Sequence, residues 1–151
     1  MSPQVIAASQ NNTAEQISTR LLSGEFNGLP VVDENDSVIG IVTALDILKA
    51  IQEGGAGGSG GGKKLNSLLA KDIMTPNPSV VKTDTPIEKV IDTIIEQEIV
   101  LVPVVDNNNK IVGVVSRLDI IREKLNEGFI TIGKREGLSR TWKKVFYNTI
   151  I

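Results

Sequence analysis

Apolar residues along this chain follow two periods, one typical of amphipathic helices and one typical of short buried strands. In residues 87–95 they recur at i, i+3, i+4, i+7 and i+8, which predicts a helix with one buried face, and residues 14–22 carry a matching stripe. Two further apolar helices are expected at 44–52 and 117–125. Short runs rich in Val and Ile predict β-strands; they cover residues 29–32, 38–42, 102–105 and 111–115.

The predicted elements occur twice, at a constant offset of 73 residues. GLPVVDENDSVIGIVTALDIL at 28–48 aligns with LVPVVDNNNKIVGVVSRLDII at 101–121. Carried upstream without a gap, the same register places Met74-Thr75-Pro76 over Met1-Ser2-Pro3. Each copy therefore predicts a strand, a helix, two strands and a helix, which places the chain in the α+β class.

The two copies are joined by GGAGGSGGG at 54–62, a composition typical of a flexible coil. A natural loop and an engineered linker look alike here, and neither predicts chemistry. A unit of roughly 50 residues is marginally stable by itself, so we expect one copy's sheet to pack against the other's. The expected divisions are a first repeat, a Gly-rich linker, a second repeat and a basic tail, at 1–53, 54–66, 67–127 and 128–151.

The composition removes most catalytic chemistry. The chain contains neither Cys nor His, which excludes disulfides, thiolate chemistry, His-based acid–base catalysis and the usual zinc sites. It also lacks a nucleophile–base pair and a Gly-rich phosphate loop followed by Lys-Ser or Lys-Thr, so we expect no enzyme activity and no catalytic cofactor. No apolar run reaches the roughly 20 residues of a membrane helix, and the first residues do not resemble a signal peptide. We expect a cytoplasmic protein with no membrane partner.

One short motif in each copy joins the end of a strand to the start of a helix. Residues 40–46 read Gly-Ile-Val-Thr-Ala-Leu-Asp, and residues 113–119 read Gly-Val-Val-Ser-Arg-Leu-Asp. A hydroxyl with an acid three positions later is typical of a helix start, where the helix dipole favours the acid. The same groups suit a ligand, because helix N–H groups bind phosphate and a carboxylate accepts hydrogen bonds from a ribose diol. The two interpretations are compatible.

The ordered set of Met-Thr-Pro, amphipathic helix, Val-Pro-Val-Val-Asp and Gly-Val-Val-Ser-x-x-Asp, present twice, resembles the CBS domain pair, or Bateman module. The resemblance covers residues 1–53 and 74–127. It implies two β-α-β-β-α units packed sheet to sheet about a pseudo-twofold axis, with two clefts that hold an adenosine-type regulator such as AMP. It also implies a homodimer and a separate, unidentified protein whose activity the module regulates.

The resemblance also implies a role for particular residues. In that family the motif's hydroxyl and carboxylate contact phosphate and ribose, which points to Thr43 and Asp46 and to Ser116 and Asp119. Backbone groups just after Met-Thr-Pro commonly meet the adenine edge, here at Ile6, Ala7, Ser79 and Val80. Apolar residues around the following Pro commonly line the base; the candidates are Gly28, Leu29, Leu101, Val102 and Pro103. Two cations are expected to meet a single phosphate, namely Lys82 and Arg117.

The sequence departs from the family pattern just before the Val-Pro strands. Members that bind multiply charged nucleotides often place Arg, Lys or His there, but 25–28 and 98–101 contain no basic residue. This difference argues against ATP and favours AMP or an uncharged adenosine ligand. Because Arg117 belongs to the second copy, we expect that copy to bind if only one does. The alternative function is a ligand-free scaffold for dimerisation, with degenerate sites.

Residues 128–151 lie outside the repeat. They carry five Lys or Arg residues, one Glu, Trp142 and Tyr147, in a chain whose formal net charge is −2. We expect this tail to pack on the body of the protein. An oligomer contact, a docking segment for a partner and a weak nucleic-acid patch stay open, although this charge is too small to indicate nucleic acid.

Overall fold

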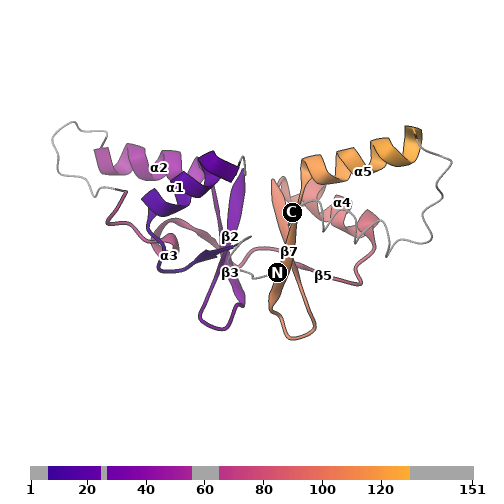
Figure 1. The fold of residues 1–151 in the computed structure, drawn as a ribbon, viewed down its shortest axis with the longest axis horizontal. Coiled ribbons are helices and arrows are strands. Elements are labelled where there is room, and N and C mark those ends of the chain that lie inside the picture. Colours follow the sequence, from indigo (N-terminus) through magenta and orange to yellow (C-terminus); the bar gives the residue numbers. More distant parts are fainter. Residues whose placement is uncertain (1–6, 25–26, 56–64, 130–151) are drawn as a thin grey trace. The chain divides into compact units, whose positions relative to one another are not determined.

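The computed structural model describes residues 7–24, 27–55 and 65–129, which form two compact units divided between Pro78 and Ser79 (Figure 1). Both units mix helices and strands, so the predicted α+β class is confirmed. The first unit contains β1 (Ala8–Ser9), α1 (Ala14–Gly24), β2 (Gly28–Val32), β3 (Val38–Thr43), α2 (Ala44–Gly55), α3 (Ala70–Ile73) and β4 (Thr75–Pro76). The second contains β5 (Val81–Lys82), α4 (Ile87–Gln97), β6 (Leu101–Val105), β7 (Ile111–Ser116) and α5 (Arg117–Phe129).

Each unit is built on a small sheet with the same pairing. In the first unit β1 lies parallel to β2 and β2 antiparallel to β3, and β5, β6 and β7 repeat this arrangement. Equivalent elements begin 73 residues apart. A bulge interrupts the pairing between Val31 and Val32 and again between Val104 and Val105. The repeat found in the sequence is therefore a repeat of the backbone.

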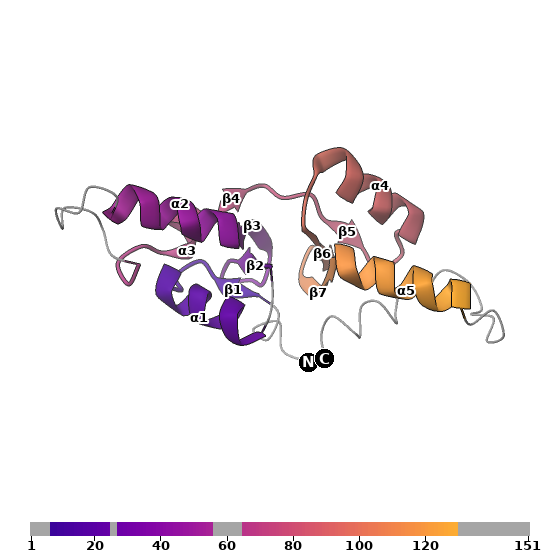
Figure 2. The ribbon, with the colours of Figure 1, turned by 90° about the horizontal axis from the view of Figure 1, so that it is seen from above.

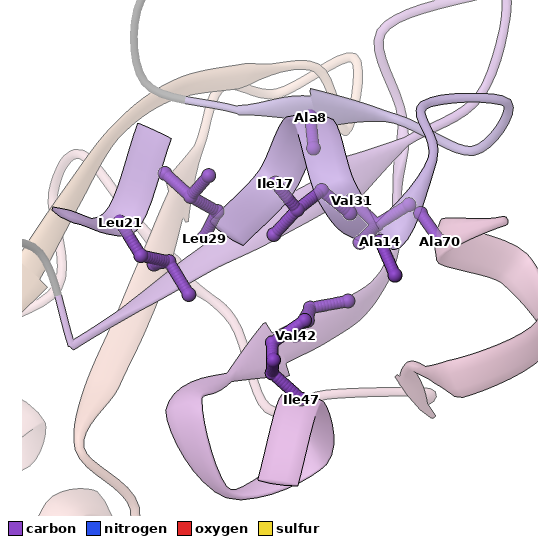
Figure 3. Close-up of a cluster of buried hydrophobic side chains, with 9 residues drawn as sticks. All are labelled: Ala8, Ala14, Ile17, Leu21, Leu29, Val31, Val42, Ile47 and Ala70. Carbon is purple, nitrogen blue, oxygen red and sulfur yellow. The ribbon is translucent and has the colours of Figure 1, made fainter. Parts of the chain in front are cut away.

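The helices of each unit cover one face of its sheet and bury a core of small aliphatic side chains. α1 and α2 lie side by side on the first sheet, and α4 and α5 lie on the second (Figure 2). The first core is formed by Ala8, Ala14, Ile17, Leu21, Leu29, Val31, Val42, Ile47 and Ala70 (Figure 3). The second is formed by Val81, Ile87, Val90, Ile94, Val102, Val104, Val115 and Ile120. Every member of the second core is the 73-residue counterpart of a member of the first.

The hairpin turns between the paired strands are fixed by an aspartate. Oδ1 of Asp33 accepts hydrogen bonds from two backbone N–H groups of its turn, at 2.8 and 3.0 Å, and Asp106 does the same at the same distances. The turns also contain Asp36 and Asn109 at φ 62° and 64°, a left-handed conformation that Asp and Asn tolerate. Identical turns keep the paired strands in the same register in both units.

The segment after the Gly-rich linker packs on the first unit. β4 pairs antiparallel with β3, with Ile41 opposite Thr75 and Gly40 opposite Pro76, so the first sheet has the order β1-β2-β3-β4. The second compact unit begins at Ser79, so residues 65–78 pack with the first unit and complete its sheet. The division of the repeats at residue 67 stays a prediction.

The segment 65–78 also accepts hydrogen bonds from the first backbone N–H groups of α1. The backbone carbonyl groups of Leu68 and Leu65 accept hydrogen bonds from the N–H groups of Ala14 (2.8 Å) and Glu15 (3.2 Å). Because the first N–H groups of a helix have no partner within the helix, these bonds replace water at the N-terminus of α1. The first unit thus depends on residues that follow the glycine run at 54–62 both for a strand and for a helix cap.

Gly40 permits β4 to lie against β3. A Cβ atom at this position would lie 2.8 Å from Cγ of Met74, would also overlap Sδ of Met74, and would lie 3.0 Å from the Thr75 carbonyl oxygen. We expect Gly40→Ala to lower the free energy of unfolding by about 1–3 kcal/mol, as overpacking commonly does. Urea denaturation measures this cost. In a Met74→Ala background, which removes the two nearest atoms, the cost should be much smaller, and an equal cost would show that Met74 is not the obstacle.

Candidate functional site

In each unit the start of one strand lies beside the end of its neighbour. Because β2 and β3 are antiparallel, the start of β2 lies beside the end of β3, whereas β1 pairs with Val31 and Val32 near the other end of β2. The register pairs Gly28 with Thr43 and, in the second unit, Leu101 with Ser116. The fold therefore brings the predicted base-lining strand and the hydroxyl–carboxylate motif to the same edge, where a helix begins.

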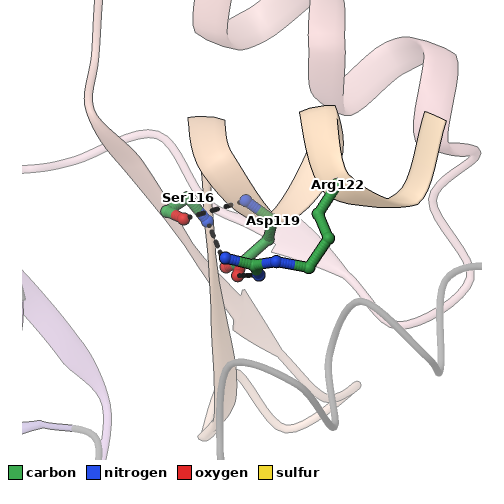
Figure 4. A network of polar contacts seen from close by, with 3 residues as sticks. All are labelled: Ser116, Asp119 and Arg122. Atoms are coloured by element: carbon green, nitrogen blue, oxygen red, sulfur yellow. Dashed lines mark hydrogen bonds and ion pairs between the residues drawn. The ribbon is translucent and has the colours of Figure 1, made fainter. Parts of the chain in front are cut away.

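The hydroxyl–carboxylate motif forms a reciprocal cap at the start of α2 and of α5. The Thr43 N–H donates to Oδ2 of Asp46 (2.8 Å), and the Asp46 N–H donates to Oγ1 of Thr43 (3.4 Å). The Ser116 N–H donates to Oδ2 of Asp119 (2.9 Å), and the Asp119 N–H donates to Oγ of Ser116 (3.2 Å; Figure 4). The helix-cap interpretation therefore holds in both repeats. The cap fixes a hydroxyl and a carboxylate at the positive end of a helix dipole.

The predicted base-lining residues separate onto two faces of their strands. All of them are buried; they are Gly28, Leu29, Leu101, Val102 and Pro103. Leu29 and Val102 belong to the two hydrophobic cores, whereas Leu101 and Pro103 alternate with Val102 and so lie on the opposite face. The residues of the core pack against the helices, so of the predicted base-lining residues Leu101 and Pro103 lie on the face away from the core.

The predicted adenine-edge segment of the first unit is held by an arginine. Ile6 lies outside the described residues. Ala7 is buried, and its carbonyl accepts a hydrogen bond from Nη1 of Arg20 at 2.6 Å. Burial lowers the pKa of Arg20 from its ordinary value. Sequence reasoning missed this contact, since Arg20 belongs to the polar side of a helical pattern and nothing in the pattern marks its reach to the first strand.

The equivalent segment of the second unit has different neighbours. The Ser79 hydroxyl donates to the side-chain carbonyl of Gln97, so α4 holds the segment that leads into β5. The Val80 side chain is partly exposed, at 37%. The position equivalent to Arg20 is Thr93, whose hydroxyl donates to the Lys89 carbonyl within α4. The two repeats therefore share a backbone but not the side chains around this segment.

Of the two predicted phosphate cations, one is engaged elsewhere. Nε of Arg117 donates to the Ile99 carbonyl at 2.8 Å. Arg117 also lines an apolar groove of about 310 Å³ between α4 and α5, together with Ile91, Ile94, Ile95, Glu98, Ile120 and Ile121. Lys82 is exposed, and its backbone N–H donates to Oγ1 of Thr85. The cation that the structure places on the motif is instead Arg122, whose Nη1 lies 3.3 Å from Oδ1 of Asp119. Its only sequence signal is its position one helical turn after Asp119.

Two further functions find no support in the part of the chain that the structure describes. Within the three described ranges no group of Asp and Glu side chains is placed to hold a metal ion. Nor does any helix there combine the length and apolar character required to cross a bilayer.

Comparison with known proteins identifies relatives over both repeats. A family model described as CBS domain matches residues 1–53 and 70–126. The uncharacterized protein MJ0188 of Methanocaldococcus jannaschii is 30% identical over 151 residues, which cover 98% of this chain and 50% of that protein. CBSX1, a chloroplastic CBS domain-containing protein of Arabidopsis thaliana, is 27% identical over 132 residues, or 75% of this chain and 56% of that protein. The chain thus spans only about half the length of these relatives.

Solved structures agree with the fold. The crystal structure of CBSX2 in complex with AMP matches with a TM-score of 0.67 and 25% identity, over 81% of this chain and 88% of that one. The CBS domain pair of MJ0100 in complex with 5′-methylthioadenosine and S-adenosyl-L-methionine matches with a TM-score of 0.65 and 32% identity, over 78% and 88% of the two chains. With a family match across both copies and the same backbone unit built twice, this chain belongs to the CBS domain family.

Proposed function

We propose that this chain is a regulatory module that binds an adenosine nucleotide, with an AMP-like ligand favoured, and modulates a separate partner protein. The observation that supports this most is the duplicated cap, which fixes a hydroxyl and a carboxylate at a helix N-terminus beside the start of a strand. Phosphate is attracted to such a terminus, and the carboxylate is an acceptor for the two hydroxyl groups of a ribose. The bound AMP of CBSX2 and the bound adenosine compounds of MJ0100 support the same class of ligand.

Regulation requires that the ligand bind two states of the module with different affinity. A nucleotide held by the start of β2, the end of β3 and the cap of α2 contacts three elements at once, so movement of any one of them changes the affinity. The partner would then respond to the state that the ligand favours. In this proposal the chain catalyses no reaction of its own. Its proposed location is the cytoplasm, a reducing compartment with which the absence of Cys is consistent.

The ligand is tested by thermal unfolding of the chain with AMP, ADP, ATP, adenosine, S-adenosylmethionine and NADH in separate samples. We expect AMP to raise the melting temperature most. A ligand at 100 times its dissociation constant stabilises the native state by about 2.7 kcal/mol, which such a measurement detects. ATP should act weakly, since the described residues place few cations at the motif. If none of these compounds stabilises the chain at millimolar concentration, the ligand-free scaffold is the correct function.

We infer that a second copy of this chain is the partner for its exposed apolar helix faces. The sequence predicts Leu22 and Ile95 on buried stripes, but their side chains are 83% and 68% exposed. Exposed leucine and isoleucine side chains also lie at equivalent positions of the second helices, namely Leu45, Leu48, Leu118 and Ile121. An apolar face can pair with its own copy about a twofold axis, because no like charges meet there. Light scattering should show a dimer that Leu48→Lys with Ile121→Lys converts to a monomer, and a wild-type monomer would contradict this inference.

A further inference from the structure

The hydroxyl–carboxylate motif carries a different cation in each repeat. In the second repeat Arg122 reaches back along α5, and its guanidinium lies against Asp119 on the side where Ser116 caps the helix (Figure 4). Side chains of an α-helix are tilted toward its N-terminus, so the Arg122 side chain can reach Asp119, one turn earlier, without strain. The equivalent residue of the first repeat is the exposed Lys49, and no ion pair between Lys49 and Asp46 is found among the described residues. The two sites therefore differ in whether a cation engages the carboxylate that would bind a ribose.

The two oxygens of each carboxylate have separate roles. Oδ2 accepts the cap hydrogen bond in both repeats, from Thr43 in the first and from Ser116 in the second. A ligand would use the other oxygen, Oδ1. In the second repeat a guanidinium already lies at Oδ1, and the arginine side chain is 55% exposed while that of Asp119 is only 10% exposed. A ligand that approaches Asp119 therefore meets Arg122 at the same edge.

We propose that Arg122 makes the second site selective for anionic adenosine ligands over neutral ones. This inference rests on the proposed nucleotide-binding function. When a ligand without a phosphate donates a ribose hydroxyl to Oδ1 of Asp119, it weakens the ion pair between Asp119 and Arg122. Such a ligand supplies no other anion for the Arg122 guanidinium. A ligand with a phosphate supplies that anion, and the five N–H donors of a guanidinium can serve a phosphate and a carboxylate together. Lys49 does not engage Asp46, so the first site lacks this selection.

The other arginines of the described residues, Arg20 and Arg117, do not duplicate Arg122. Arg117 donates to the Ile99 carbonyl and lines the groove between α4 and α5. Arg20 belongs to the first unit, and the bond described above directs it to the Ala7 carbonyl at the start of the first strand. An ion pair between residues three apart on a helix also stabilises the helix slightly. The test must therefore separate selection of a ligand from support of the helix.

AMP and adenosine are suitable probes because they differ only by the phosphate. Isothermal titration calorimetry on the full chain, in an Asp46→Ala background, reports on the second site. We expect AMP to bind there about tenfold more tightly than adenosine, or more, as charge-assisted hydrogen bonds commonly give. Arg122→Gln should reduce AMP to the affinity of adenosine, and Arg122→Lys should retain part of the preference. The matched control is Lys49→Gln in an Asp119→Ala background, which should leave the ratio of AMP to adenosine affinity at the first site unchanged.

The outcomes separate this inference from the proposed function. If Arg122→Gln weakens AMP and adenosine equally, Arg122 supports the helix and does not select the ligand, and the inference is wrong. A change in the ratio of the two affinities, with the melting temperature of the ligand-free variant unchanged, supports it. If neither compound binds the wild-type chain, the proposed function fails and the inference fails with it.

Discussion

Replacing both Asp46 and Asp119 by asparagine is expected to abolish the stabilisation that AMP gives to the wild-type chain. Each carboxylate offers two acceptor oxygens to the two hydroxyl groups of a ribose diol, whereas an amide in its place keeps one acceptor, carries an NH2 donor at the other position and has no charge. A wild-type gain of about 2.7 kcal/mol at 100 times the dissociation constant should fall to nearly zero at the same AMP concentration. Thermal unfolding with and without AMP measures the difference.

The same double variant also loses helix caps, so its ligand-free stability must be measured separately. Both carboxylates accept the N–H of the cap residue at 2.8 and 2.9 Å, and the weakened caps should cost about 1 kcal/mol each without any ligand. Asp92→Asn, which neutralises an exposed carboxylate on α4, is a control that should keep the AMP effect. A double variant that AMP still stabilises fully would show that these carboxylates do not hold the ribose.

Most of the fold could be predicted because the same pattern occurs twice. The apolar runs around Val31 and Val104 and the helical spacing of Ile87, Val90 and Ile94 identify elements whose bounds the structure shifts by only a residue or two. The place of residues 65–78 could not be predicted. The repeat assigns Met74 to the second copy, whereas its packing depends on the empty space above Gly40, which is a tertiary property.

The backbone arrangement of the candidate site could be predicted from the sequence, but the partners of its charged side chains could not. The spacing of Thr43 and Asp46 predicts both a cap and a ligand contact, and the structure shows the cap. The positions of the positively charged groups depend on the conformations of long, flexible side chains. Arg117 stands beside Ser116 in the sequence but bonds to Ile99, while Arg122, one turn further on, returns to Asp119. Sequence spacing does not determine which of two arginines on a helix turns toward its start.

Replacing Ile17 by alanine is expected to cost the first unit about 2–5 kcal/mol. Ile17 is fully buried in α1 and packs in the first core (Figure 3), so truncation removes buried apolar area and leaves a cavity. Ile87→Ala, at a fully buried position of the second core, should have a similar cost. Urea denaturation followed by circular dichroism measures both, and Leu22→Ala, at an exposed position, should change stability by less than about 0.5 kcal/mol.

These two core variants also test whether the repeats unfold together. Each repeat has its own core, and the two clusters share no residue. If the repeats unfold as one cooperative unit, Ile17→Ala and Ile87→Ala shift a single transition. Two transitions, of which each variant moves one, would show that the repeats are separate folding units. A cost below 1 kcal/mol at Ile17 would contradict the core assignment itself.

The strand that residues 75–76 add to the first sheet bears on how the repeats can be separated. β4 covers the outer side of β3 with hydrogen bonds from beyond the glycine run. A fragment that stops at that run would leave β3 as an open edge, and open edges recruit strands from other molecules and promote aggregation. A fragment that continues through Pro78 keeps its edge covered. The boundary at which the first repeat can stand by itself is therefore set by strand pairing, four residues beyond the point where the sequence begins to repeat.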